Sequence, residues 1–177
     1  MKALIVYESM FGNTGKVAEA VAEGVRGHMA VELVATDHAP AALPEEVDLL
    51  VVGGPTHAFS MTRANTREDA VRQGATAATT TGIREWIGRL HDGAHGELVA
   101  TFDTRVARTG GRVRHFPGSA AKSAAKALRK AGFEVVVPPE SFWVEDTAGP
   151  LFEGETERAR QWGERIAAAV EHKAGAR

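Results

Sequence analysis

The sequence predicts an α/β protein built on a doubly wound parallel sheet with helices on both faces. Short, continuous apolar runs rich in Val and Leu recur along the chain, which is typical of strands buried on both faces of a sheet. Stretches with helical periodicity fall between these runs, and this alternation favours parallel strands joined by helical crossovers. A chain of 177 residues can bury one sizeable core. We therefore expect a single domain over residues 1–177, with about 172–177 as a loose C-terminal tail.

Five strands are expected. The fifth covers Phe133–Val137 and restarts at Phe142–Val144. Pro138 and Pro139 separate its two parts, because proline cannot donate a hydrogen bond to the ladder. The other four strands are expected at Ala3–Tyr7, Val31–Ala35, Val47–Val52 and Leu98–Phe102.

Four helices are expected from apolar residues spaced three and four apart. Gly27, Gly93 and Gly132 can end the first three, and Ser119 can cap the start of the third. A short additional helix is expected around Glu68–Arg72. The apolar faces consist of Val17, Val21 and Val25; of Ile83, Trp86, Ile87 and Leu90; of Ala120, Ala124, Ala127, Leu128 and Ala131; and of Trp162, Ile166 and Val170.

Two long loops are predicted, over 59–81 and 105–118, and a shorter one follows the first strand. Long loops in compact domains are usually functional or disordered. Ligands of open α/β sheets bind outside the carboxyl ends of the strands, where these three loops begin. We therefore expect the functional site at that edge of the sheet.

The composition excludes several classes of function. The chain has no cysteine, which rules out disulfides, thiol redox chemistry and cysteine-bound metals or clusters. Its net charge of −2 argues against a nucleic-acid partner. The apolar run before Glu8 is too short for a signal peptide, and no segment approaches the length of a membrane span. A cytoplasmic protein without a membrane partner is therefore expected.

The loop after the first strand reads ESMFGNTG, and glycine-containing loops between a strand and a helix often bind phosphate. An ATP or GTP P-loop is disfavoured, because Met10 replaces its first glycine and Val17 its Ser or Thr. A dinucleotide fingerprint is also incomplete, since only Gly12 and Gly15 are present. A phosphoryl-receiver domain would need paired acidic residues here, and only Glu8 is available.

Two interpretations of this loop remain. It could be a plain strand–helix turn capped by Asn or Thr. Alternatively, Ser9, Asn13 and Thr14 supply the hydroxyl and N–H donors that surround the phosphate monoester of flavin mononucleotide (FMN). The second interpretation gains support from resemblance to a known family.

The segment SMFGNTGKVAEAVAEG resembles the phosphate loop of the flavodoxin family, whose pattern is Ser/Thr-x-x-Gly-Asn-Thr. GGPTHAF after the third strand and VATFDTR after the fourth resemble the second and third flavin loops of that family. The resemblance implies a five-stranded parallel sheet of order 2-1-3-4-5, bound FMN and electron transfer. It implies no catalytic residue and no metal site.

The resemblance also implies the residues that contact FMN. Those around the phosphate are Ser9, Met10, Phe11, Gly12, Asn13 and Thr14. Those along the ribityl chain and one flavin face are Pro55, Thr56, His57, Ala58 and Phe59. Those at the other face and the pyrimidine edge are Phe102, Asp103, Thr104, Arg105 and the loop as far as Gly111.

The sequence departs from the family at several points. Phe11 stands where the family commonly has Thr, and Arg105 aligns with a position that is often Tyr. Beside a flavin, Arg105 would stabilise the anionic reduced form. The segment Arg105–His115 is basic, although family shuttles are acidic. It is either a solvated loop or a site for a redox partner protein or a small anionic substrate.

Three functions are consistent with these features. The first is an FMN-binding electron carrier. The second is an FMN-dependent oxidoreductase that acts on a quinone or another small anionic substrate. The third is a module of the same fold that binds flavin weakly.

Overall fold

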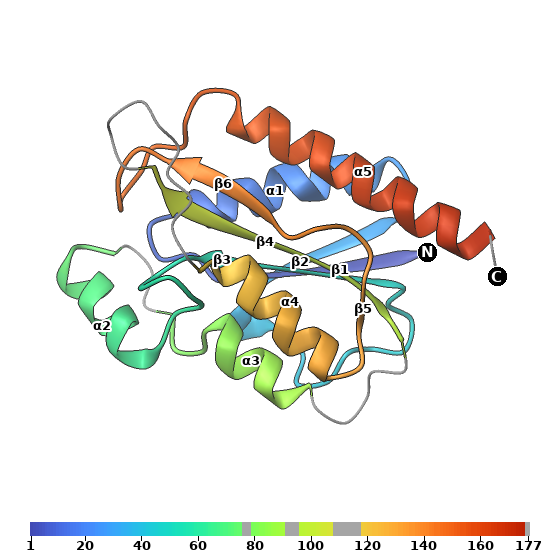
Figure 1. Ribbon diagram of the computed structural model, residues 1–177, viewed down its shortest axis with the longest axis horizontal. Helices are drawn as coiled ribbons and strands as arrows, with labels where there is room; N and C mark the ends of the chain where they lie inside the picture. The colour runs from blue at the N-terminus through green and yellow to red at the C-terminus, as the bar shows by residue number, and fades with distance from the viewer. Residues whose placement is uncertain (76–78, 91–95, 108–117, 176–177) are drawn as a thin grey trace.

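The computed structural model describes residues 1–75, 79–90, 96–107 and 118–175, and shows a parallel sheet between two layers of helices (Figure 1). The strand order is β2-β1-β3-β4-β5, and β6 pairs with the far end of β4. Every pairing between these strands is parallel, as the sequence predicts. The strands are β1 (Lys2–Tyr7), β2 (Ala30–Ala35), β3 (Leu49–Pro55), β4 (Leu98–Val106), β5 (Glu134–Val135) and β6 (Glu140–Val144).

The helices cover both faces of the sheet (Figure 1). On one face lie α1 (Asn13–Arg26) and α5 (Glu155–Gly175), and on the other lie α3 (Ile83–Arg89) and α4 (Ala120–Lys130). The helix α2 (Ala64–Arg72) lies beyond the carboxyl ends of the strands, where the functional site is expected. A short 3-10 turn, η1 (Thr36–His38), connects β2 to β3.

Two hydrophobic cores follow from the alternation of side chains along the buried strands. In β1, Ile5 faces the core under α1 and α5, whereas Leu4 faces the core under α3 and α4. Trp162 and Trp86 are the largest side chains of these two cores, and both are buried. The residues that the sequence assigns to helix faces therefore do pack against the sheet.

Four expectations about the elements need correction. β3 and β4 continue past their expected ends to Pro55 and Val106, so part of the expected loops is strand. The double proline divides the fifth strand into β5 and β6, as expected. The short helix α2 begins at Ala64, four residues earlier than expected.

The remaining two corrections concern helix ends. α3 ends at Arg89, and its expected stop, Gly93, lies outside the described residues. α5 continues to Gly175, so residues 172–175 are helical rather than a loose tail. Among the helices of the described ranges, none has both the length and the apolar character needed to cross a membrane.

Candidate flavin site

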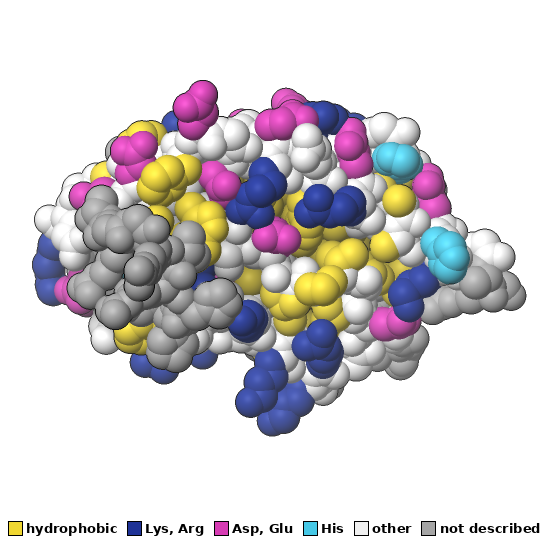
Figure 2. All heavy atoms as spheres, turned by 45° about the horizontal axis from the view of Figure 1, so that its top comes forward, with side chains coloured by type: hydrophobic (Ala, Val, Ile, Leu, Met, Phe, Trp, Pro, Cys, Tyr) yellow, Lys and Arg dark blue, Asp and Glu magenta, His cyan; other side chains and the backbone are white. Residues whose placement is uncertain are grey.

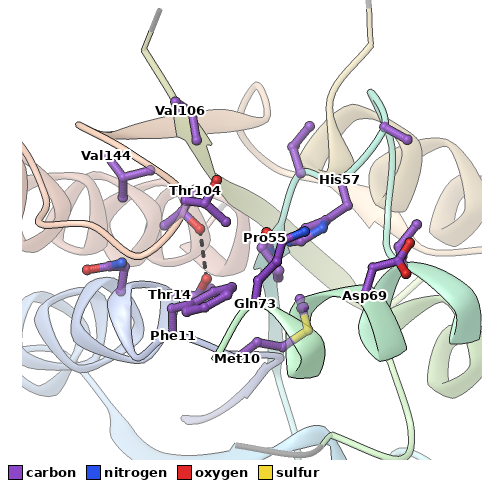
Figure 3. Close-up of a pocket in the computed structure, with 16 residues that line it drawn as sticks. Met10, Phe11, Thr14, Pro55, His57, Asp69, Gln73, Thr104, Val106 and Val144 are labelled. Carbon is purple, nitrogen blue, oxygen red and sulfur yellow. Dashed lines mark hydrogen bonds between the residues drawn. The ribbon is translucent and has the colours of Figure 1, made fainter. Parts of the chain in front are cut away.

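A cavity of about 300 Å3 opens at the carboxyl ends of β1, β3 and β4 (Figure 3). This is the edge at which open α/β sheets bind their ligands, and the volume lies at the lower end of the usual range for small-molecule pockets. The structure brings together residues from all three of the expected flavin loops. Those that line the cavity are Met10, Phe11, Asn13, Thr14, Pro55, Thr56, His57, Ala58 and Thr104.

The first wall is the phosphate loop, Ser9–Gly15. Gly12 precedes α1 with a positive φ of 87°, a conformation that glycine adopts without strain. The Ser9 hydroxyl accepts a hydrogen bond from the Gly15 N–H at 3.1 Å, so Ser9 and Gly12 shape the loop rather than line the cavity. The hydroxyls of Thr14 and Thr104 hydrogen-bond at 2.7 Å and connect this loop to β4 (Figure 3).

The beginning of α1 makes this loop suitable for an anion. Asn13 and Thr14 are the first two residues of the helix, and both are buried. The opening N–H groups of an α-helix have no partner within the helix and lie at the positive end of its dipole. A phosphate placed there would meet N–H and hydroxyl donors without a basic side chain.

A second segment, after β3, forms the opposite wall. Ala58 and Phe59 have positive φ values of 45° and 66°, and reciprocal backbone hydrogen bonds of 3.0 Å join His57 to Ser60 around them. The turn directs His57 into the cavity (Figure 3). Phe59 is 55% exposed and does not line the cavity, although the sequence placed it along the flavin.

Burial lowers the pKa of His57 below its ordinary value of 6.5. The ring is therefore neutral at pH 7, with one nitrogen that donates and one that accepts. A neutral imidazole can hydrogen-bond a flavin edge without adding charge to the site.

Phe102 does not belong to the site. Its ring is fully buried against Phe142 and Trp162, with edge-to-face centroid distances of 6.1 and 5.9 Å. Gly53 makes room for it, because a Cβ at that position would lie 2.0 Å from the ring. The expectation failed because β4 extends to Val106, so Phe102 is a core residue in mid-strand.

The extension of β4 also changes the placement of Asp103 and Arg105. The Asp103 carboxylate is fully buried and hydrogen-bonds Thr56 and Ser119 instead of lining the cavity. The Arg105 guanidinium lies over the Trp143 ring, 5.5 Å from its centroid, and is likewise absent from the lining. Alternate residues of a strand point to opposite faces of the sheet. Asp103 and Arg105 therefore point to the face opposite to that of Thr104, which lines the cavity. Gly111 lies outside the described residues.

The structure adds residues that sequence reasoning missed. A whole wall comes from α2, which the sequence indicated only as a short helix without a role. β6 and the loop after it complete the cavity, and Gly149 of that loop lies against Asn13, where a Cβ would be 2.6 Å from its carboxamide. No motif marks these positions. The additional lining residues are Thr66, Asp69, Ala70, Gln73, Val106, Val144 and Thr147.

Comparison with known proteins agrees with this geometry. The family model for flavodoxins matches residues 5–85, which include the end of β1, the phosphate loop and β3. This part of the chain is similar to flavodoxins. No curated protein sequence matches the chain.

Solved structures share the flavodoxin fold over the whole chain. A flavodoxin from the domain Archaea aligns with a TM-score of 0.66 at 20% identity, over 97% of this chain and 100% of its own. Oxidised flavodoxin 2 from Bacillus cereus gives 0.65 at 20% identity, over 98% and 99%. Rubredoxin oxygen:oxidoreductase from Desulfovibrio gigas gives 0.61 at 19% identity, over 98% of this chain but 37% of its own. At these low sequence identities, the structural similarity shows that this chain has the same fold as these proteins.

The flavodoxin family implies FMN as the cofactor, and the residues of the cavity fit that group. FMN carries a phosphate at one end and a flat, largely apolar ring at the other. The start of α1 suits the phosphate, because its N–H groups and hydroxyls are donors at the positive end of the helix. Phe11, Ala58, Val106 and Val144 give the rest of the cavity apolar surface. Within the described residues, the aromatic side chains that line the cavity are those of Phe11 and His57.

Proposed function

We propose that this protein binds FMN in the cavity at the carboxyl ends of β1, β3 and β4 and transfers electrons through it. The observation that carries the proposal is the cavity itself, in which the donors of the phosphate loop lie next to apolar surface. Bound FMN supplies reversible electron transfer. The protein has no cysteine, so this chemistry would come from the cofactor.

The residues of this chain would then bind and orient the cofactor. The N–H groups of Asn13 and Thr14, the Asn13 carboxamide and the Thr14 hydroxyl would bind the phosphate, and Ser9 would hold the loop in shape. Pro55 and Thr56 would contact the ribityl chain, and Thr104, hydrogen-bonded to Thr14, would hold the phosphate loop against β4. His57, kept neutral by burial, provides one hydrogen-bond donor at the edge of the ring.

An FMN-dependent oxidoreductase is the second candidate, and the wall formed by α2 favours it. Thr66, Asp69 and Gln73 extend the cavity with polar side chains beyond the residues that the family motif implies. Such a wall would offer polar contacts to a small substrate, for example a quinone, that approaches the flavin. Steady-state turnover of quinones with a nicotinamide reductant would support this candidate. If no turnover is measured, the function as an electron carrier is favoured.

The visible absorption spectrum of the purified protein tests the proposal. We expect flavin bands and stoichiometric FMN after release from the denatured protein. Titration of flavin-free protein should quench FMN fluorescence saturably. A colourless protein without saturable quenching would refute the proposed function. Stepwise anaerobic reduction would then distinguish one-electron from two-electron chemistry.

A further inference from the structure

The turn His57–Ser60 has an unfavourable backbone that its surroundings must support. Ala58 and Phe59 both have positive φ, which non-glycine residues rarely adopt. Strained backbone of this kind persists only where neighbouring structure holds it in place. Contacts on both sides of the turn supply this support, and the turn directs His57 into the cavity.

On one side, the turn is attached to the buried carboxylate of Asp103. Thr56, directly before the turn, donates a hydrogen bond to Asp103 Oδ2 at 2.8 Å and accepts one from the Ala120 N–H at 2.8 Å. The same Oδ2 atom accepts from the Ser119 hydroxyl at 2.5 Å and from the Ala121 N–H at 3.0 Å. Asp103 thus joins the end of β3 to the start of α4.

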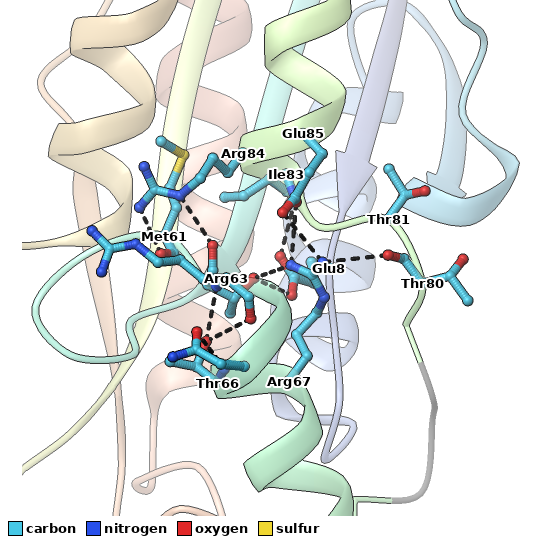
Figure 4. A network of polar contacts seen from close by, with 12 residues as sticks. Glu8, Met61, Arg63, Thr66, Arg67, Thr80, Thr81, Ile83, Arg84 and Glu85 are labelled. Atoms are coloured by element: carbon cyan, nitrogen blue, oxygen red, sulfur yellow. Dashed lines mark hydrogen bonds and ion pairs between the residues drawn. The ribbon is translucent and has the colours of Figure 1, made fainter.

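On the other side, the turn is attached to the buried carboxylate of Glu8. Thr62, two residues after the turn, donates to Glu8 Oε1 at 2.6 Å, and the Ile83 N–H donates to Oε2 at 3.0 Å (Figure 4). Arg67 of α2 donates to the Thr62 hydroxyl at 3.1 Å and pairs with Glu85 at 3.2 Å. Glu8 thus joins the end of β1 to the start of α3.

The hydrogen bonds around Asp103 and around Glu8 follow the same pattern. Both acids are fully buried, and each belongs to a strand beside β3: Glu8 directly follows β1, and Asp103 lies within β4. Each accepts one hydrogen bond from a threonine next to the turn and one from a backbone N–H in the first turn of a helix. A buried carboxylate is costly unless it is hydrogen-bonded, so the two threonines are held strongly.

We propose that Glu8 and Asp103 are positioning residues that hold the turn His57–Ser60 through Thr62 and Thr56, and thereby keep His57 in the cavity. Neither acid lines the cavity, so each acts through its threonine. The effect on FMN rests on the proposed function, whereas the placement of His57 does not depend on it.

The first test follows the His57 ring by NMR in flavin-free protein, with His57→Gln to assign the signal. Burial lowers the pKa of His57, so the wild type should titrate below 6.5. Asp103→Ala and Thr62→Val should each raise the midpoint towards 6.5, because the turn loosens and the ring gains solvent. Glu68→Gln, on the exposed face of α2, is the matched control and should leave the midpoint unchanged.

Two further variants separate positioning from general damage to the fold. Asp103→Asn should behave like the wild type, because all three donors address one oxygen and an asparagine oxygen there accepts the same bonds. Ala58→Gly, added to Asp103→Ala, should restore the wild-type midpoint, since glycine adopts a positive φ without strain.

FMN affinity provides the second readout. Asp103→Ala and Thr62→Val should weaken FMN binding about tenfold, the effect of one lost hydrogen bond, and Ala58→Gly should recover it. Folded variants that keep the wild-type His57 midpoint would overturn the proposal, as would an equal shift in Glu68→Gln. If the wild type does not bind FMN, the proposed function fails, and the His57 titration alone decides the positioning role.

Discussion

At the scale of single residues, the phosphate loop gives the sharpest prediction. Thr14→Ala and Asn13→Ala should each weaken FMN binding, because each removes a donor close to the phosphate. A lost hydrogen bond to a charged group costs about 1.5–3 kcal/mol, which is about tenfold to a hundredfold in affinity. Fluorescence titration of flavin-free protein measures the effect.

Riboflavin is the matched ligand control for this prediction. It lacks the phosphate, so it should bind more weakly than FMN and respond less to Thr14→Ala. Lys16→Ala should change neither affinity strongly, because Lys16 is exposed on the first turn of α1. An equal loss for FMN and riboflavin in Thr14→Ala would show that Thr14 acts through Thr104 rather than on the phosphate.

A second prediction at this scale concerns the buried carboxyl of Glu8. Burial raises its pKa above the ordinary value of 4.5, although hydrogen bonds from Thr62 and Ile83 and the charge of Arg67 oppose this. With the folded pKa above the unfolded one, the native state binds more protons between the two values, so stability falls as pH rises. Glu8→Gln removes this titration.

The measurement is urea denaturation of the wild type and Glu8→Gln at a series of pH values. The free energy of unfolding of the wild type, minus that of the variant, should decrease as pH rises from about 4.5 through the raised pKa. A difference that grows with pH would mean that hydrogen bonds outweigh burial and that the pKa is lowered.

At the scale of elements, the contact between α1 and α5 depends on glycine. A Cβ at Gly24 would lie 2.0 Å from the carbonyl oxygen of Arg160, so the two helix backbones are in direct contact. Gly24→Ala should therefore destabilise the protein by about 1–3 kcal/mol or more, since overpacking forces the backbones apart. Denaturant unfolding measures the change.

Gly27 provides the control within the same segment. It has φ −65° and no atom within 4 Å of an added Cβ. Gly27→Ala should be neutral or stabilise the protein by about 0.4–1 kcal/mol, because alanine restricts the unfolded chain. Equal stability of the two variants would contradict the close contact between α1 and α5.

At the scale of the whole molecule, charge decides which partners the protein meets. Acidic and basic side chains both occur on the face in Figure 2, and the net charge is −2. The basic residues Arg108, Arg112 and Arg114 lie outside the described residues, so their role stays a prediction from the sequence. Replacing all three with Ala should slow reoxidation by an anionic acceptor without releasing flavin.

Salt dependence tests this electrostatic prediction. Exposed charges are screened within about 10 Å at 0.1 M salt, so the loss of rate should shrink as salt increases. Arg26, Arg89 and Arg129 lie in the last turns of α1, α3 and α4, at the opposite edge of the sheet, and their triple Ala variant is the control. If the two triple variants are reoxidised at equal rates at low salt, the segment Arg105–His115 is a solvated loop and does not recruit the acceptor.

The sequence by itself determined the fold class and the location of the site. Apolar runs buried on both faces determine a parallel sheet, and the motif Gly12–Thr14 at the end of β1 marks the phosphate loop. These signals are local, because hydrophobic periodicity and glycine conformation depend on neighbours in the chain. The family match over residues 5–85 includes this motif.

Only the tertiary structure decided which residues face the cavity. β4 runs four residues further than its apolar run, and the alternation of its side chains places Phe102 in the core and Arg105 over Trp143. The wall from α2 and the buried acids Glu8 and Asp103 depend on contacts between segments far apart in the sequence. No local pattern encodes such contacts, because they arise when the strands and helices pack together.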